Sequence, residues 1–378
     1  MRVLHVAPSL ARSFGGPTHS LIGFAAAART AGFEVTIAGP EPPPDDRTWF
    51  AGQLPGTEVM SFSASGRGAF VASPGLLRWL RREVRRFDVA HVHGLWNPVS
   101  SLAARVCLRS ECPVVIRPFG TLSRYTFAHR RTLLKRVYRR LVDGPNLRAA
   151  AGVHFTTDAE RDEAAWHGIS FQGRSWVIPP PAASSAAPGP ARGANRGEPV
   201  VLCLCRLDPI KNLEALLDAW PGVSARVPGA RLVVAGDGDR AYVARLRERA
   251  AAAGGRVEFA GFVSGSAKAE LFAAAALFVL PSHHENFGIS VFEALAAGLP
   301  VVVSPEVQLA PFVREHGFGE VVSPEPPALA EAIVRSLGDP ALAERCALRA
   351  PEVVASRYSP AAVGDLLGRM YRSVKRAG

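Results

Sequence analysis

Short apolar runs alternate with helical segments along the whole chain, and no other feature constrains the fold as strongly. The apolar runs lie at residues 3–7, 33–38, 87–93, 113–117, 152–157, 176–178, 200–204, 232–235, 257–263, 277–281 and 301–303. Continuous runs of this kind, separated by helices, are typical of parallel strands that are covered on both faces. The alternation therefore predicts an α/β protein built from two doubly wound, Rossmann-like sheets facing each other across a cleft.

Length and composition agree with two domains joined by an exposed connector. A chain of 378 residues with 48% hydrophobic content can bury two cores of ordinary size. Between them, PPPAASSAAPGPARGANRGEP is too biased toward Pro, Ala and Gly to bury a core. We predict an N-terminal domain at residues 1–180, a linker at 181–199, a second domain at 200–355 and a final helical segment at 356–378.

Residues 282–304, SHHENFGISVFEALAAGLPVVVS, form the most informative single stretch. Turn chemistry is followed by a short helix that stops at Gly298, and then by an apolar strand. Gly288 allows a ligand to approach the backbone, and the first amides of the helix are unpaired donors at the positive end of its dipole. Such a helix start can hold a phosphate or a ring of sugar hydroxyls.

Charge and cysteine content limit the class of protein. The net charge is +11, and residues 1–180 contain 23 Lys and Arg against 13 Asp and Glu, whereas the remainder contains 21 against 20. An acidic partner would therefore meet the first half. No apolar run reaches the length of a membrane span, and strand pattern begins at the N-terminus without a signal peptide. The five scattered cysteines are expected to be buried thiols of a cytoplasmic protein.

The string ENFGISVFEALAAGLPVVVS resembles the donor-site signature of retaining GT-B glycosyltransferases of family 4, and RLDPIKN resembles their diphosphate-binding loop. The resemblance implies that Arg206 and Lys211 bind the diphosphate, while Glu285 helps to orient the transferred sugar. It further implies that Glu293 accepts hydrogen bonds from the ribose and that the final helix crosses back to the first domain. The remaining implied donor-site residues are Gly15, Gly16, Phe262, Val263, Asn286, Phe287, Gly288 and Ile289.

The same resemblance places the acceptor site in the first half. HVHGLW is similar to the segment that borders the acceptor pocket in this family, which implies acceptor-side roles for His93 and Trp96 and a catalytic role for His93. Relatives often carry a histidine or an arginine where this chain has Phe119. Arg117 or His93 is expected to take over that polar contact. A hydrogen-bonded histidine at the end of a strand remains an alternative interpretation of His93.

Two patterns raise the question of a metal ion. His91 and His93 share one side of a predicted strand, but no third His, Cys or acid follows at ligand spacing. Asp237 and Asp239 form a D-x-D pattern, which the flanking glycines make more typical of a tight turn. We therefore predict a metal-independent enzyme without a cofactor, whose nucleotide-sugar is a substrate.

Residues 124–148, RYTFAHRRTLLKRVYRRLVDGPNLR, combine apolar residues at helical spacing with many basic ones. The spacing predicts a helix that buries Leu133, Leu134, Val137 and Leu141 and exposes a basic face. That face is either simply solvated or attracted to an anionic membrane or a lipid-diphosphate acceptor. No nucleic-acid-binding motif accompanies the charge.

Together these features predict a hexosyltransferase that uses a UDP- or GDP-sugar and a glycan, lipid-linked or small-molecule acceptor. Polysaccharide or glycoconjugate biosynthesis at the inner face of the membrane is the expected setting, with the protein cytoplasmic or peripheral. Two alternatives stay open, namely a sugar-nucleotide epimerase or phosphorylase on the same fold, and a non-catalytic GT-B subunit.

Overall fold

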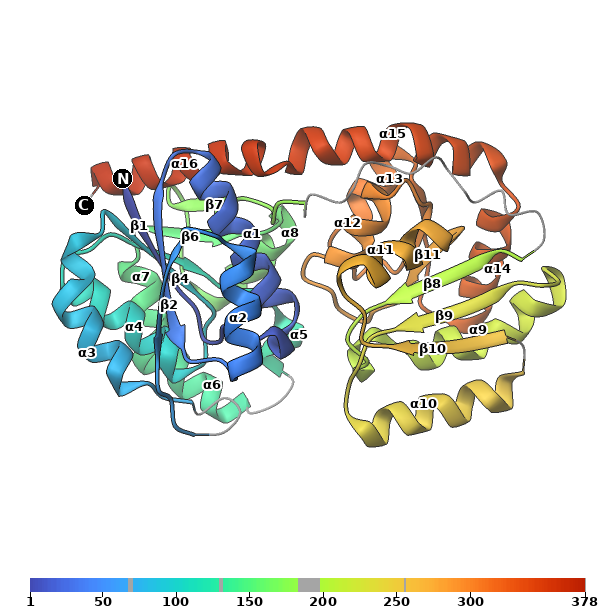
Figure 1. Ribbon diagram of the computed structural model, residues 1–378, viewed down its shortest axis with the longest axis horizontal. Coiled ribbons are helices and arrows are strands. Elements are labelled where there is room, and N and C mark those ends of the chain that lie inside the picture. The colour runs from blue at the N-terminus through green and yellow to red at the C-terminus, as the bar shows by residue number, and fades with distance from the viewer. Residues whose placement is uncertain (67–70, 129–131, 183–197, 255, 378) are drawn as a thin grey trace. The chain divides into compact units, whose positions relative to one another are not determined.

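A computed structural model describes residues 1–66, 71–128, 132–182, 198–254 and 256–377 (Figure 1). The chain divides into two compact units. The first comprises Met1–Pro181 together with Tyr358–Gly378, and the second comprises Ala182–Arg357. Most of the predicted linker lies outside the described residues.

The first unit is built on a seven-stranded sheet in its described part, with strand order β3-β2-β1-β4-β5-β6-β7. Every pair of neighbours in it is parallel. The central strands are buried on both faces, which is why their sequences read as continuous apolar runs. The strands are β1 (Arg2–Val6), β2 (Glu34–Pro40), β3 (Glu58–Phe62), β4 (Val89–His93), β5 (Val114–Arg117), β6 (Gly152–Phe155) and β7 (Ser175–Val177).

Helices cover both faces of this sheet. One apolar cluster lies on the face packed by α3, α4 and α7, and a second lies on the face packed by α1 and α16. Helix α16 packs along α1, and Gly364 allows close approach because a Cβ there would come within 2.5 Å of the Ala27 carbonyl oxygen. The helices are α1 (Gly16–Thr30), α2 (Pro44–Gln53), α3 (Pro74–Glu83), α4 (Pro98–Arg109), α5 (Arg124–Ala128), α6 (Thr132–Tyr138), α7 (Gly144–Ala149), α8 (Asp158–Ala164) and α16 (Pro360–Ala377).

The second unit repeats this design with six parallel strands among its described residues, in the order β10-β9-β8-β11-β12-β13. Its strands are β8 (Val200–Leu204), β9 (Arg231–Ala235), β10 (Arg256–Gly261), β11 (Leu277–Leu280), β12 (Val301–Val303) and β13 (Gly319–Val321). Its helices are α9 (Leu213–Arg226), α10 (Arg240–Ala253), α11 (Gly265–Ala274), α12 (Ile289–Ala296), α13 (Ala310–His316), α14 (Pro326–Leu337) and α15 (Pro340–Tyr358).

Each sheet has one point at which the strand order reverses. In the first unit it lies between β1 and β4, and in the second between β8 and β11. Loops that leave two strands at such a point diverge to opposite faces, which opens a crevice at the carboxyl ends of the strands. The fold therefore singles out the loops after β1, β4, β8 and β11 as ligand-binding positions.

The predicted α/β class with two parallel sheets is confirmed, with differences in detail. Strand β3 was missed because it is a partly exposed edge strand without a continuous apolar run. The stretch 124–148 is broken into α5, α6, a π-helical turn (Arg139–Asp143) and α7. The expected burial of its apolar face is wrong for Leu133, Val137 and Leu141, which are 76%, 45% and 60% exposed. The side chain of Leu134 lies outside the described residues.

The cysteines are free thiols, and all except the half-buried Cys205 are buried. Among the described residues, no helix has the length and apolar character needed to cross a membrane.

Candidate functional site

The loops after β8 and β11 meet through one ion pair. Lys211 ends a short 3-10 turn (Pro209–Lys211) in the β8 loop, and its Nζ donates to the Glu285 carboxylate in the β11 loop. The pair is mostly shielded from solvent, with side chains only 12% and 20% exposed. A backbone hydrogen bond of 2.8 Å from His283 N to the Ile210 carbonyl joins the same two loops. The reversal point of the sheet thus brings together residues 74 positions apart.

Burial and pairing act in opposite directions on these two groups. Burial alone would raise the pKa of Glu285, but the charge and hydrogen bond of Lys211 hold it below its usual value. Likewise, burial would lower the pKa of Lys211, and Glu285 raises it instead. Both groups are therefore charged at neutral pH, and each is the counter-ion of the other.

Arg206 is the second residue after β8 and lies in the same loop. Its side chain is 68% exposed, and its Nη2 lies 3.5 Å from the Asp208 carboxylate, a long and weak contact. The neighbouring β9 loop holds this loop in place, because Gly238 forms a parallel β-bridge with Leu207. A Cβ on Gly238 would lie only 2.0 Å from the Leu207 carbonyl oxygen. An exposed guanidinium on a fixed loop is well suited to closing on an anion.

Helix α12 begins at Ile289, four residues after Glu285. Gly288, its N-cap, has φ of 86°, a left-handed conformation that favours glycine, and this N-cap has no side chain that could bond the first amides. The amides at Ile289 and the next positions lack partners within the helix and carry its positive end. Phe287 is buried below them, and Asn286 lies in the preceding turn. A helix start is thus present at the predicted residues, and anion binding there stays a prediction.

Three further predicted donor-site residues, Glu293, Phe262 and Val263, lie on the same unit. Glu293 is one helical turn into α12, and its carboxylate accepts a 2.6 Å hydrogen bond from Lys268 of α11. Sequence reasoning missed Lys268, because no motif surrounds it. The one available signal was its position in the helix before β11, the strand that leads into residues 282–304. Phe262 and Val263 follow β10, and the Phe262 ring is 55% exposed. The described strands of this unit are all parallel, so these loops share the carboxyl edge of the sheet.

Gly15 and Gly16 lie in the first unit, at the start of α1. Gly15 has φ of 73° and serves as the N-cap, and its carbonyl accepts from Thr18 N and His19 N. A Cβ on Gly15 would meet no atom within 4 Å, so the glycine is required for its conformation and not for space. Pro17 has no N–H and the amides of Thr18 and His19 are already bonded, so this helix start offers few free backbone donors.

The predicted acceptor-side residues lie at the carboxyl ends of β4 and β5 and are buried. His93 is fully buried, and its Nε2 lies 2.9 Å from Nδ1 of His5. Trp96 is held by hydrogen bonds from its backbone amide to Asp143 and from its indole to the Thr121 carbonyl. Arg117 donates to Ser20 Oγ at 2.8 Å and lies between the rings of Phe24 and Phe119. Their direct contact with a substrate stays a prediction.

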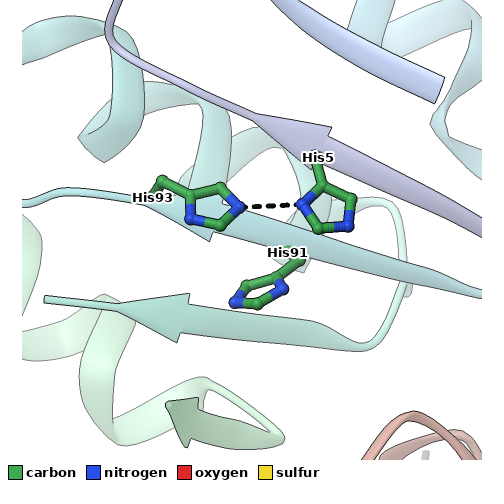
Figure 2. A group of neighbouring side chains, drawn as sticks. All are labelled: His5, His91 and His93. Atoms are coloured by element: carbon green, nitrogen blue, oxygen red, sulfur yellow. Dashed lines mark hydrogen bonds between the residues drawn. The ribbon is translucent and has the colours of Figure 1, made fainter. Parts of the chain in front are cut away.

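Sequence reasoning missed the third histidine beside His91 and His93. Figure 2 shows His5 of β1 next to the two β4 histidines, and one nitrogen of each lies within 4.8 Å of the others. The premise that no third ligand accompanies the pair was therefore wrong, because the partner comes from a strand far earlier in the chain. The sequence did contain a signal for this partner. His5 alternates with the apolar residues of the strand at residues 3–7 and therefore shares the buried side of Val3 and Ala7.

Both units match known families. Residues 15–181 match the family described as Glycosyl transferase 4-like domain, and residues 190–353 match Glycosyl transferases group 1.

Relatives and solved structures extend across the chain. The chain is 28% identical over 319 residues to the Alpha-D-kanosaminyltransferase of Streptomyces kanamyceticus, covering 79% of this chain and 82% of that one. It is 27% identical to the Phosphatidyl-myo-inositol mannosyltransferase of Mycolicibacterium smegmatis, covering 100% and 95%. The fold is similar to Anabaena Alr3699/HepE in complex with UDP and glucose, with a TM-score of 0.79, 20% identity and coverage of 99% and 100%.

Proposed function

This chain belongs to the family 4 glycosyltransferases of the GT-B fold, and on that premise we propose that it is a metal-independent, retaining hexosyltransferase using a UDP- or GDP-sugar. The observation that carries the proposal is the shielded Lys211–Glu285 pair at the reversal point of the second sheet, with Arg206 above it. Names of the relatives support sugar transfer, and the Anabaena protein of similar fold is a complex with UDP and glucose.

The second unit would hold the donor. Lys211 and Arg206 would bind the diphosphate, and the start of α12 at Phe287 to Ile289 would add backbone donors. As the bond to the sugar breaks, negative charge grows on the leaving phosphate, and these groups are already placed to stabilise it. Lys211 would share its protons between Glu285 and the phosphate, so the pocket changes its hydrogen bonds without moving its backbone.

The two glutamates would take different roles. Glu285 would accept hydrogen bonds from hydroxyls of the transferred sugar while keeping Lys211 charged and oriented. Glu293 would accept from the ribose hydroxyls, with Lys268 holding its carboxylate. Phe262 and Val263 would border the base. In a retaining transfer the acceptor hydroxyl attacks from the side of the leaving phosphate, whose oxygen takes its proton, so no carboxylate nucleophile is needed.

The acceptor would meet the first unit, through Trp96, His93 and Arg117 near the strand ends. The relatives' names include a phosphatidyl-myo-inositol mannosyltransferase and a kanosaminyltransferase. We therefore propose a cyclitol or sugar ring, either free or attached to a lipid, as the acceptor, in the biosynthesis of a cell-surface polysaccharide or another glycoconjugate.

Peripheral membrane binding is supported by the surface of α6 and the turn after it. Leu133, Val137 and Leu141 recur at every fourth position and are exposed, so they form an apolar stripe. The same segment contains Lys135, Arg136, Arg139 and Arg140, of which Arg136 and Arg140 are exposed. An apolar line within a basic surface matches an anionic bilayer, into which the leucines would insert while the cations contact headgroups.

Donor binding and transfer test the proposal together. UDP and GDP are titrated by calorimetry, and a panel of their sugars is screened by thermal shift, where a bound donor raises Tm. Arg206→Ala should abolish most transfer with the fold intact, because it removes a cation from the leaving phosphate. Arg249→Ala, which removes another exposed arginine, paired with Asp218 on the same unit, is the control.

Three results would contradict the proposal. Near-normal turnover by Arg206→Ala would remove the assignment of that residue. Conversion of a nucleotide-sugar to an epimer without acceptor, or phosphate-dependent sugar release, would identify the other enzyme classes of this fold. Absence of heat with both UDP and GDP would favour a non-catalytic subunit.

A further inference from the structure

A polar layer lies inside the first unit, between the sheet and the helices α1 and α16. Alternation along β1, β4, β5 and β6 leaves the opposite face apolar, whereas this face carries polar side chains beside apolar ones such as Val3, Val89 and Val115. Burying so many polar groups is costly unless each has a partner. The members of the layer are His5, His91, His93, Arg117, His154 and Tyr371, and each is at most 2% exposed.

One fixed acceptor sets the direction of the hydrogen bonds in this layer. The carbonyl of Ile178 can only accept, so Nε2 of His154, at 2.7 Å, must carry the proton. A neutral His154 then has a bare Nδ1, which accepts from Nε2 of His91 at 3.1 Å. Burial holds the pKa of both imidazoles well below the usual value, so both are neutral at pH 7.

The same reasoning continues to the reversal point of the sheet. Nδ1 of His91 is bare and accepts from the Tyr371 hydroxyl at 2.8 Å. The Tyr371 hydroxyl uses its proton in this bond, so its oxygen can only accept from Nε2 of His5, which lies 3.4 Å away. Nε2 then carries the proton of the neutral His5 ring, and Nδ1 of His5 is bare. That Nδ1 accepts from Nε2 of His93 at 2.9 Å, the bond drawn in Figure 2. His93 therefore ends with an unprotonated Nδ1, which is buried and has no partner among the described residues.

Arg117 supplies complementary donors beside this nitrogen. His93 and Arg117 are register partners on β4 and β5, so their side chains leave the same face of the sheet. One Arg117 nitrogen donates to Ser20, whereas Nε and Nη1 are buried without partners, and the guanidinium makes no ion pair, within the part of the chain that the structure describes. Burial lowers the pKa of Arg117 to about 9. Phe24 is fully buried and Phe119 is half-buried, so Phe119 is the more exposed of the two rings that contact the guanidinium.

We propose that this position is a subsite for one hydroxyl group of the acceptor ring, which accepts from Arg117 and donates to Nδ1 of His93. A hydroxyl is the small group that is donor and acceptor at once, as this pair demands. A carboxylate or phosphate would satisfy Arg117 but would face a bare nitrogen lone pair. The inference rests on the proposed function, since it takes the hydroxyl from the acceptor. His5, His91, His154 and Tyr371 are positioning residues that fix the tautomer of His93.

A metal ion held by His5, His91 and His93 fits the same place less well. Each of these rings already has a histidine or tyrosine partner in the layer. The described residues of the layer include no carboxylate, and the Arg117 charge opposes a divalent cation. Hydrogen bonding therefore accounts for the cluster better than coordination does.

The tautomers can be read directly by long-range proton–nitrogen NMR of histidine-labelled full-length protein at neutral pH. We expect His93 as the Nε2–H form, with the nitrogen shift of Nδ1 typical of an unprotonated imidazole. A protonated Nδ1 in His93 would overturn this order of hydrogen bonds. Zinc in the purified protein, with metal-shifted signals of His5, His91 and His93, would overturn it as well.

Titration with myo-inositol and, separately, D-glucose tests the subsite. The Nδ1 signal of His93 should shift in a saturable manner with at least one of them, while His167, a buried histidine bonded to the Leu122 carbonyl, stays unchanged. No change of His93 with either compound overturns the subsite. UDP and GDP calorimetry on the same sample separates the two claims, since nucleotide binding without this response removes only the subsite.

Tyr371→Phe tests the positioning role, because it removes the hydroxyl that links His91 to His5. We expect His93 to populate both tautomers and the apparent Kd for the responding ring compound to rise about fivefold, as for one lost hydrogen bond. Tyr242→Phe removes a comparable buried hydroxyl bond, to Glu214 in the second unit, and should change neither. An unaltered His93 tautomer in Tyr371→Phe would contradict the role.

Discussion

The reversal points of the two sheets use opposite electrostatic designs. In the second unit, loops carry the functional groups, and the buried cation Lys211 has its own anion, Glu285. In the first unit, strands carry them, the histidines are neutral, and the buried cation Arg117 makes no ion pair among the described residues, although the buried Glu160 carboxylate attracts it without such a contact. The same fold thus offers a directly compensated cation in one unit and a pre-ordered layer without a direct ion pair in the other.

This difference indicates which kind of ligand the Lys211–Glu285 pair and the histidine layer can each bind. A compensated pair can exchange partners when a doubly charged phosphate arrives, because the lysine remains charged with or without it. A fixed series of neutral rings cannot follow a change of charge, but it can present one donor and one acceptor at constant geometry. The first design suits charge that develops during a reaction, and the second suits recognition of a neutral hydroxyl.

The largest expected effect comes from removing the compensated cation. Lys211→Ala should lower kcat by about 100- to 1,000-fold, as for loss of one preorganised charged donor. Glu285 would also be left without a partner, so the thermal stability should fall as well. Transfer kinetics and melting curves measured on the same preparation give both values. Wild-type kcat in Lys211→Ala would show that the pair is structural only.

Acid should affect the two places in different pH windows. The folded-state pKa of His5 is lowered to about 3, and the values for His91, His93 and His154 are also held well below 6.5. The unfolded chain therefore binds more protons below pH 6.5, and each histidine costs about 1.4 kcal/mol of stability per pH unit from there downward.

The Glu285–Lys211 pair responds to acid in a lower pH window, because here a carboxyl pKa is lowered in the folded state. Its contribution is present above the ordinary glutamate value of 4.5 and is lost as pH falls below it. Protection from hydrogen exchange, relative to the intrinsic rate at each pH, should fall between pH 7 and 5 in peptides of β1 and β4 before those of β8 and β11. An equal loss of protection in both units would contradict the neutral histidine layer.

The sequence predicted the second unit's site better than the first unit's layer. ENFGISVFE and RLDPIKN are local motifs, so Lys211, Glu285 and Gly288 could be named from the sequence alone. The layer is assembled from β1, β4, β5, β6 and α16, and its members His5 and Tyr371 are 366 positions apart. Strand order, which decides their adjacency, is a long-range property that no single-sequence pattern contains.

The local sequence pattern also could not predict which helical faces are exposed to solvent. Leu133, Val137 and Leu141 have the spacing of a buried helical face, yet they lie on the surface because α6 is followed by a π-helical turn and α7. Periodicity states that residues share a face, but packing decides whether that face is covered.

Replacing each cation by methionine should give stability changes of opposite sign. Arg117→Met removes a buried charge that makes no ion pair among the described residues and is attracted only indirectly by Glu160. We expect the change to stabilise the protein by roughly 1–3 kcal/mol while weakening the ring-hydroxyl response. Lys211→Met leaves Glu285 unpaired and should destabilise by roughly 1–2 kcal/mol, a value reduced by residual exposure. Denaturant unfolding measures both changes. Destabilisation by Arg117→Met would mean that the attraction of the buried Glu160 carboxylate outweighs the cost of burying the guanidinium.

The smallest effects come from two glycines, one outside the predicted sites and one that supports the β8 loop. Gly168→Ala adds a Cβ to open space but forces alanine to φ of 66°, which costs roughly 1 kcal/mol and leaves UDP affinity unchanged. Gly238→Ala instead places a Cβ 2.0 Å from the Leu207 carbonyl oxygen, so the β8 loop must shift. UDP titrations of both variants should show weaker binding only for Gly238→Ala. Because Gly238 supports the loop that carries Arg206 and Lys211, equal affinity in both variants would mean that this loop does not bind the diphosphate.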